Sequence, residues 1–316
     1  MTNILITGGA GFIGSHLVRA LLQRGDSVRV LDNFSTGRRE NLAGLRGDLK
    51  IIEGDLRDPL KVAEAVRSVD IIFHEAAFVS VPQSMQEPLT CLDINVNGTA
   101  TLLEAARQAG VRRVVLASSA AVYGEAQAFP LTENISAPLL SPYAASKRTD
   151  EIYADFYTHA LGLPVVALRY FNVYGPRQRP DSPYAAAIPI FARRMLARQP
   201  VTIFGDGGQS RDFVYVGDVV RANLMAAEAP QAPGRTFNIC TGTEISLLDL
   251  LATLHNLLPD APSAQFADPR PGDIYRSLGS PALAAQVLGF HAQVTLAEGL
   301  HQTIEWMKHE TPHLPA

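Results

Sequence analysis

A tyrosine and a lysine near the middle of the chain have a spacing that permits acid–base chemistry. Tyr143 and Lys147 stand four residues apart in the segment Ser-Pro-Tyr-Ala-Ala-Ser-Lys. On a helix, two such positions share one face and lie one turn apart. An ammonium beside a phenol favours the phenolate, which can take a proton from a substrate hydroxyl. Alone the pattern is weak evidence, because on an exposed helix it is usually a solvated pair.

A glycine-rich segment near the start of the chain has the spacing of a dinucleotide-binding turn. Gly8, Gly11 and Gly14 lie between an apolar segment and an amphipathic one that begins with Phe12 and Ile13. Glycines in this pattern let the backbone approach a pyrophosphate at a helix N-terminus. The alternative is a flavodoxin-like or nucleotide-sensing domain with a chance glycine pattern.

An acidic residue at the expected distance predicts which dinucleotide binds. Asp32 follows Gly14 by eighteen residues and ends the second predicted strand. Its carboxylate can bind both hydroxyls of the adenosine ribose and would repel a 2′-phosphate. The sequence therefore favours NAD, while Arg38 and Arg39 keep NADP as an alternative.

Later predicted strands end in residues that suit the same crevice. Asp55 follows the third strand, Ala76 and Ala77 follow the fourth, and Ser119 ends the fifth. The carboxyl ends of parallel strands face the ligand. Asp55 is thus expected near the adenine, and the two alanines are expected to let the dinucleotide pass closely. Ser119 is expected to share a substrate hydroxyl with Tyr143.

The order of apolar and amphipathic segments predicts an α/β fold: a doubly wound parallel Rossmann sheet with a smaller C-terminal α/β substrate lobe. We assign residues 1–169, with a return segment at about 213–240, to the NAD-binding domain, and 170–212 and 241–316 to the lobe. The predicted strands are Asn3–Thr7, Ser27–Leu31, Lys50–Glu53, Asp70–His74, Arg113–Ser118, Leu163–Arg169, Phe213–Val216 and Thr236–Ile239. The predicted helices are Phe12–Arg24, Leu60–Arg67, Leu92–Gln108, Tyr143–Ala160, Ile188–Arg198, Asp218–Glu228, Leu247–Leu258, Pro281–Leu288 and Leu296–His309.

Composition excludes several classes of function. The net charge of −4 argues against a nucleic-acid-binding surface. Two cysteines cannot form a disulfide framework, and no cysteine–histidine pair has zinc spacing, so no metal is expected. There is no apolar stretch of about 18 residues, and we expect no membrane span. The chain starts without a signal-peptide pattern, and a cytoplasmic protein is expected.

Taken together, these motifs resemble the extended short-chain dehydrogenase/reductase family, and within it the UDP-hexose 4-epimerases. The resemblance covers nearly the whole chain. It rests on residues 8–14, 32–33, 74–77, 95–99, 118–124, 143–147, 169–177, 210–214 and 270–273, whose order and spacing are more specific than any one motif. In this family Phe213 is often Tyr, so one hydroxyl contact would be lost here.

The resemblance implies a role for each matching residue. Asn33, Ser35, Asp55 and Leu56 would hold the adenosine half of NAD, and Asn95, Ser118, Lys147 and Tyr170 would lie around the nicotinamide half. Asn172 would contact the phosphate of a UDP-sugar, while Ala187, Ile188, Thr202 and Phe204 would surround the uridine. Arg211 and Arg270 would clamp the pyrophosphate, and Asp273 would bind the nucleotide ribose.

The resemblance also favours one reaction within the family. Related dehydratases carry Asp-Glu, and decarboxylases a Glu, where this chain has Ala120 and Ala121, so 4-epimerisation through a 4-keto intermediate is expected. UDP-uronate 4-epimerisation or another nucleotide-sugar oxidation stays open, as do net oxidation with release of NADH and an inactive NAD sensor. Ser277 stands where narrow epimerases carry a bulky Tyr, so N-acetylhexosamine substrates are expected to fit. A homodimer through a four-helix bundle is the family expectation.

Overall fold

The computed structural model describes residues 1–180, 186–269 and 274–310. Its largest element is a seven-stranded sheet in the order β11-β6-β5-β4-β1-β2-β3. Each neighbouring pair in this sheet is parallel. The fold is therefore the predicted doubly wound α/β sheet. Its strands are β1 (Asn3–Thr7), β2 (Ser27–Asp32), β3 (Leu49–Glu53), β4 (Ile71–His74), β5 (Arg113–Ser119), β6 (Val165–Tyr170) and β11 (Thr236–Ile239).

Helices cover both faces of the sheet, because successive strand residues point to opposite sides. Ile4 and Ile6 of β1 belong to one buried cluster and Leu5 belongs to the other. The first cluster includes residues of α1 (Phe12–Arg24), α8 (Val216–Glu228) and α10 (Ala282–Leu288). The second includes residues of α2 (Pro59–Val66), α5 (Gly98–Gln108) and α6 (Pro142–Leu161). Strands buried on both faces explain the continuous apolar runs in the sequence.

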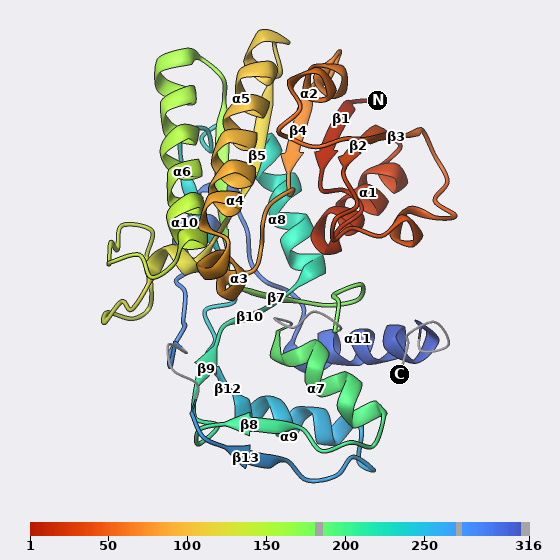
Figure 1. The fold of residues 1–316 in the computed structure, drawn as a ribbon, viewed down its shortest axis with the longest axis vertical. Helices are drawn as coiled ribbons and strands as arrows, with labels where there is room; N and C mark the ends of the chain where they lie inside the picture. Colours follow the sequence, from red (N-terminus) through yellow and green to blue (C-terminus); the bar gives the residue numbers. More distant parts are fainter. Residues whose placement is uncertain (181–185, 270–273, 311–316) are drawn as a thin grey trace.

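A smaller body lies beside the sheet in Figure 1 and has its own core. It contains α7 (Ala187–Leu196), α9 (Leu247–Leu257), α11 (Leu296–Glu310) and three two-stranded pairs: β7 (Asn172–Tyr174) with β10 (Phe213–Tyr215), β9 (Ser210–Arg211) with β12 (Ile245–Ser246), and β8 (Thr202–Phe204) with β13 (Gln265–Ala267). Phe12 and Ile13, just after β1, pack against this core. The body therefore sits at the carboxyl ends of the sheet strands.

Two predictions about these elements were wrong. The segment predicted as strand Phe213–Val216 does not return to the large sheet, because β10 pairs with β7, whereas Thr236–Ile239 does join it beside β6. The predicted helix Leu92–Gln108 is not one α-helix. The chain forms α3 (Val81–Gln86), α4 (Pro88–Leu92), a π-helical turn at Asp93–Asn97 and then α5. Such π turns occur often at functional sites, and this one contains Asn95.

Other boundaries shift by a few residues at most, as helix and strand ends commonly do. None of the helices in the described part of the chain has both the length and the apolar character needed to cross a membrane.

Candidate active site

The helix α6 presents the tyrosine and the lysine. Ser141 caps it, because its Oγ accepts a hydrogen bond from the Ala144 amide at 3.1 Å, and Pro142 occupies the first helical position. Tyr143 thus lies in the first turn. Its amide donates to Ser84 Oγ of α3 at 3.2 Å, so a second helix fixes the start of α6.

Lys147 is almost fully buried one turn further on. Its Nζ donates to Asp150 Oδ2 at 3.2 Å, and the two side chains are only 3% and 2% exposed. Burial by itself would lower the pKa of Lys147, but Asp150, with smaller contributions from Tyr143 and Glu75, outweighs it and raises that pKa. The lysine therefore carries its charge beside Tyr143. Asp150, on the same helical face, was missed from the sequence although its i+3 spacing could have revealed it.

The end of β5 supplies the serine hydroxyl. Ser119 lies opposite Tyr170 of β6 in the sheet register. Its Oγ accepts a hydrogen bond from the Ala121 amide at 3.2 Å, which begins a 3₁₀ turn, and this leaves the hydroxyl proton to donate. Ser118 is buried and its hydroxyl donates to Glu151 at 2.6 Å. The two neighbouring serines thus have different surroundings.

The turn after β1 has the close packing that a dinucleotide-binding loop requires. Gly8 has φ of +68°, and a Cβ there would lie 2.7 Å from the Ala76 nitrogen. A Cβ on Gly14 would lie 2.2 Å from the Gly8 carbonyl oxygen. The Gly11 amide donates to that same oxygen at 3.0 Å. Because the glycines of the turn carry no side chains, the backbone of the first turn of α1 can offer its free N–H groups to phosphate oxygens.

Asp32 ends β2 and supports this turn. Its carboxylate accepts hydrogen bonds from the amides of Ala10 at 2.9 Å and Phe34 at 2.8 Å. Burial raises the pKa of Asp32. Arg39 forms an ion pair with Glu53 and lies over the Phe34 ring. The carboxylate therefore fixes the loop, and the residues present fit NAD.

The residues predicted around the adenosine form one hydrogen-bonded group after β2 and β3. Asn33 donates to Asp55 at 2.9 Å and accepts from the Ser35 amide at 3.0 Å. Two nitrogens of Arg57 bind Asp55, and this pairing holds the pKa of the Asp55 carboxyl well below its usual range. The Leu56 side chain is instead buried in the core.

Asn95 and Tyr170, predicted near the nicotinamide, both form hydrogen bonds within the protein. Asn95 binds the backbone N–H and C=O of Phe78 at 2.7 and 3.1 Å, and so it positions the segment after Ala76 and Ala77. The hydroxyl of Tyr170 donates to Glu75 at 2.8 Å. Burial raises the pKa of Glu75 to about 7. This carboxyl was missed from the sequence, where nothing separates it from an ordinary surface glutamate.

The predicted substrate-binding residues come from the smaller body. Asn172 is on β7, and Ala187 and Ile188 begin α7, although the Ile188 side chain is buried in the core. Thr202 and Phe204 are on β8, Arg211 is on β9, and the Ser277 amide donates to Ser210 of β9 at 3.2 Å. Arg270 and Asp273 lie outside the described residues.

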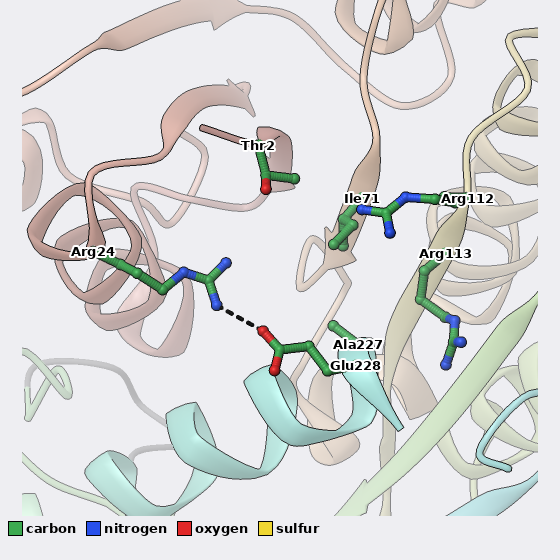
Figure 2. A pocket seen from close by; sticks show the side chains of 7 residues that line it. All are labelled: Thr2, Arg24, Ile71, Arg112, Arg113, Ala227 and Glu228. Atoms are coloured by element: carbon green, nitrogen blue, oxygen red, sulfur yellow. Dashed lines mark hydrogen bonds and ion pairs between the residues drawn. The ribbon is translucent and has the colours of Figure 1, made fainter. Parts of the chain in front are cut away.

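A separate hollow of about 280 Å³ lies at the amino ends of the strands (Figure 2). Three arginines line it, but Arg24 pairs with Glu228 across it and with Asp26, so part of the positive charge is compensated. Arg113 donates to the carbonyls of Ala226 and Ala229. This hollow lies at the opposite edge of the sheet from Ser119, which ends β5. Over the ranges described, no group of three side chains suited to hold a metal ion is found.

A parallel sheet with a glycine turn after β1 and polar side chains at the carboxyl ends of its strands is typical of a dinucleotide-binding α/β protein. Residues 4–240 match the model of the NAD dependent epimerase/dehydratase family, and the chain belongs to that family.

Three relatives illustrate the range of this family. A UDP-glucose 4-epimerase of Mycolicibacterium smegmatis is 41% identical over 97% of this chain and 99% of its own. The UDP-N-acetylglucosamine 4-epimerase of Methanobrevibacter ruminantium, solved with UDP-N-acetylmuramic acid, is 37% identical with a TM-score of 0.94 and covers 98% of this chain and 99% of its own. The UDP-glucuronic acid 4-epimerase of Bacillus cereus, solved with UDP-glucuronic acid and NAD, is 31% identical with a TM-score of 0.90 over the same shares.

Proposed function

We propose that this protein is an NAD-dependent UDP-sugar 4-epimerase that interconverts UDP-glucose with UDP-galactose and accepts the N-acetylhexosamine pair as well. The observation that carries the proposal is the charged, buried Lys147 one helical turn from Tyr143, on a helix packed against β5, whose end carries Ser119. The 41% identity to a UDP-glucose 4-epimerase supports this substrate class.

The residues of the chain divide the chemistry among them. Bound NAD would take a hydride from C4 of the sugar and return it to the opposite face. Tyr143, as phenolate, removes the O4 proton during oxidation and gives it back during reduction. The protonated Lys147 stabilises this phenolate, and Ser119 donates a hydrogen bond to O4. The configuration at C4 inverts without net oxidation.

The positions that would support a competing reaction carry no acid or base. Ala120 and Ala121 form the 3₁₀ turn directly after Ser119. Methyl groups cannot move a proton, so elimination of water and decarboxylation lack the groups that the related enzymes use. The buried Glu75 is held by Tyr170, whose hydroxyl also accepts from Asn223.

We assign the remaining roles as proposals. The residues after β1, β2, β3 and β4 hold the adenosine and pyrophosphate of NAD: Gly8, Gly11, Phe12, Ile13, Gly14, Asp32, Asn33, Ser35, Asp55, Leu56, Ala76 and Ala77. Asn95, Ser118 and Tyr170 shape the nicotinamide end. The UDP-sugar is bound by Asn172, Ala187, Ile188, Thr202, Phe204, Arg211, Arg270, Asp273 and Ser277. This division corresponds to an NAD-binding domain (1–169 and a return segment) and a UDP-sugar-binding lobe (170–212 and 241–316).

The test is a panel of UDP-hexoses, UDP-N-acetylhexosamines and UDP-uronates incubated with the pure protein and NAD. C4 epimers are resolved by chromatography or NMR, and nicotinamide absorbance is followed in parallel. We expect epimers of the glucose series with no net change in absorbance. Turnover of UDP-uronates alone would favour UDP-uronate 4-epimerisation as the function, whereas net release of NADH would exclude an epimerase.

Ser277 is expected to decide whether the N-acetyl group fits. The side chain is small and the residue is 9% exposed. Replacing Ser277 by Tyr should lower kcat/KM for UDP-GlcNAc by roughly 10–200-fold while UDP-glucose changes little, because the added ring fills the space for the acetamido group. Ser277→Ala, which leaves the space open, is the control. Equal loss of both substrates would show that this position does not control sugar size.

We propose that the exposed apolar face formed by Leu89, Leu92, Ile152, Tyr153 and Phe156 is the homodimer interface. These residues lie on α4 and α6, which pack together, and Leu89 is 80% exposed. Pairing with a second copy would bury this face in a four-helix bundle. Phe156→Asp should give monomers by light scattering, whereas Leu60→Asp, at an exposed position of α2, should not. A monomeric wild type would contradict the proposal.

We also propose that the protein is cytoplasmic. Its two cysteines are buried and free, which suits a reducing compartment.

A further inference from the structure

The Lys147 ammonium has an acidic partner that the reaction described above does not use. Asp150 lies 3.2 Å from Lys147 Nζ, and both side chains are nearly excluded from solvent. A carboxylate this close cancels much of the positive charge that Lys147 presents to Tyr143. Because a buried carboxylate is costly unless it is paired and hydrogen-bonded, the arrangement must be stabilised from a second side.

That second side is a group of buried polar side chains that reaches from α5 to β4 and β1. Burial raises the pKa of Asp150 to about 6, and Lys147 and then Thr99 of α5 act against that rise. His74 Nε2 lies 2.9 Å from the Thr99 hydroxyl oxygen, and its Nδ1 lies 2.7 Å from the hydroxyl of Thr7. All four side chains are at most 2% exposed.

The two ring nitrogens of His74 each face a threonine hydroxyl, Nε2 that of Thr99 and Nδ1 that of Thr7. Burial lowers the pKa of His74 to about 3, so the ring is neutral. A neutral imidazole donates one of these hydrogen bonds and accepts the other. The histidine therefore adds no second positive charge near Lys147, and the ammonium is the cation that Asp150 meets.

The charges expected during the reaction suggest why a carboxylate lies here. Bound NAD⁺ would add a positive nicotinamide to the positive Lys147 and the Tyr143 phenolate. Once proton and hydride had left the substrate, the nicotinamide and the tyrosine would be neutral and Lys147 would still be positive. These three groups would together carry one positive charge in both states, which the Asp150 carboxylate offsets.

We propose that Asp150 is a positioning residue for the reaction: its carboxylate fixes the Lys147 ammonium toward Tyr143 and keeps that ammonium charged although both side chains are buried. The proposal rests on the proposed epimerase function for its catalytic consequence. Its structural part, the coupling of the Lys147–Asp150 pair, stands on the geometry alone.

Other ionisable groups face the pair and must be separated from it in the test. On α6 these are Tyr143 and Glu151, on β4 and its end His74 and Glu75, and on α4 Cys91. Glu151 is held by Arg169, and the pKa of Cys91 is raised by burial. Of these groups, only Asp150 forms a hydrogen bond with the Lys147 ammonium in the described part of the chain.

The first measurement is the pH profile of kcat/KM for Asp150→Asn, which preserves shape and removes charge. Without the carboxylate, burial lowers the pKa of Lys147, so the alkaline limb should move down by about 1–3 pH units. Asp155→Asn is the matched control, because Asp155 lies on the same helix and is 66% exposed. Asp150→Glu, which retains the charge, should shift the limb less than Asp150→Asn. An unshifted limb in a folded Asp150→Asn protein overturns the proposal.

The second measurement needs neither cofactor nor substrate. Thermal denaturation is compared for the wild type, Lys147→Met, Asp150→Asn and the double variant. Lys147→Met leaves a buried carboxylate unpaired and should lower Tm, and adding Asp150→Asn should restore much of the loss. Strictly additive changes in Tm would show that the pair is not coupled and would overturn the proposal. If the wild type turns over no UDP-sugar, this cycle still tests the pair, so the two failures are distinguishable.

Discussion

Replacing Tyr143 by phenylalanine should lower kcat by about 10²–10⁴-fold, the range that general acid–base catalysis supplies. The change removes only the hydroxyl oxygen that exchanges a proton with the sugar O4. The backbone contacts of the residue, from its amide to Ser84 and from the Ser146 hydroxyl to its carbonyl, do not involve that oxygen. The helix start should therefore persist, and steady-state assay with the best UDP-sugar measures the loss.

Two controls make this result specific. Tyr153→Phe removes a hydroxyl from an exposed position on the same helix and should retain activity. Calorimetric titration with NAD should give a similar affinity for Tyr143→Phe and wild type, which excludes loss of cofactor as the cause. If Tyr143→Phe retained wild-type turnover, the proposed base would be wrong.

The largest effect on stability is expected from Arg169→Met. Arg169 donates to both carboxylate oxygens of Glu151, at 2.7 and 2.8 Å, and both side chains are 2% exposed. It also donates to the Tyr123 hydroxyl at 2.8 Å and to the Glu133 carbonyl at 3.1 Å. Removing the guanidinium leaves a buried carboxylate without its main partner, which costs about 3–5 kcal/mol of unfolding free energy. Denaturation in urea with a two-state fit measures the change.

The matched controls separate burial from the ion pair as such. Arg198→Met breaks the pair with Asp260, in which the side chains are 75% and 79% exposed, and should cost less than about 1 kcal/mol. Adding Glu151→Leu to Arg169→Met should recover much of the loss, because no unpaired charge remains. A loss for Arg169→Met no larger than for Arg198→Met would contradict the buried-charge explanation.

The same pair has a defined pH dependence. Burial alone would raise the pKa of Glu151, but the hydrogen bonds and charge of Arg169, with further hydrogen bonds from Ser118 and Arg148, outweigh it and hold that pKa below its ordinary value. A lowered pKa in the folded state means that the pair stabilises the protein fully above the ordinary glutamate range. This contribution is lost as pH falls through the lowered pKa.

The sequence by itself determined the parts of this protein that depend on short spacings. The strand–glycine turn–helix at residues 3–24 and the pair Tyr143 and Lys147 are local patterns, set by backbone freedom at glycine and by the helical period. The order of apolar segments likewise predicts the parallel sheet, because βα units alternate along the chain.

Only the tertiary structure decided which distant groups meet. β10 pairs with β7 and not with the sheet, and the long predicted helix breaks at the turn that holds Asn95. The hydrogen-bonded residues Thr7, His74 and Thr99 join two strands to α5. A hydroxyl or imidazole in a sequence carries no mark of its partner, because such bonds depend on strand order and on which face each helix covers. The surroundings of Lys147 therefore include His74 and Glu75, which are distant in the sequence and are brought close to it by the folded sheet.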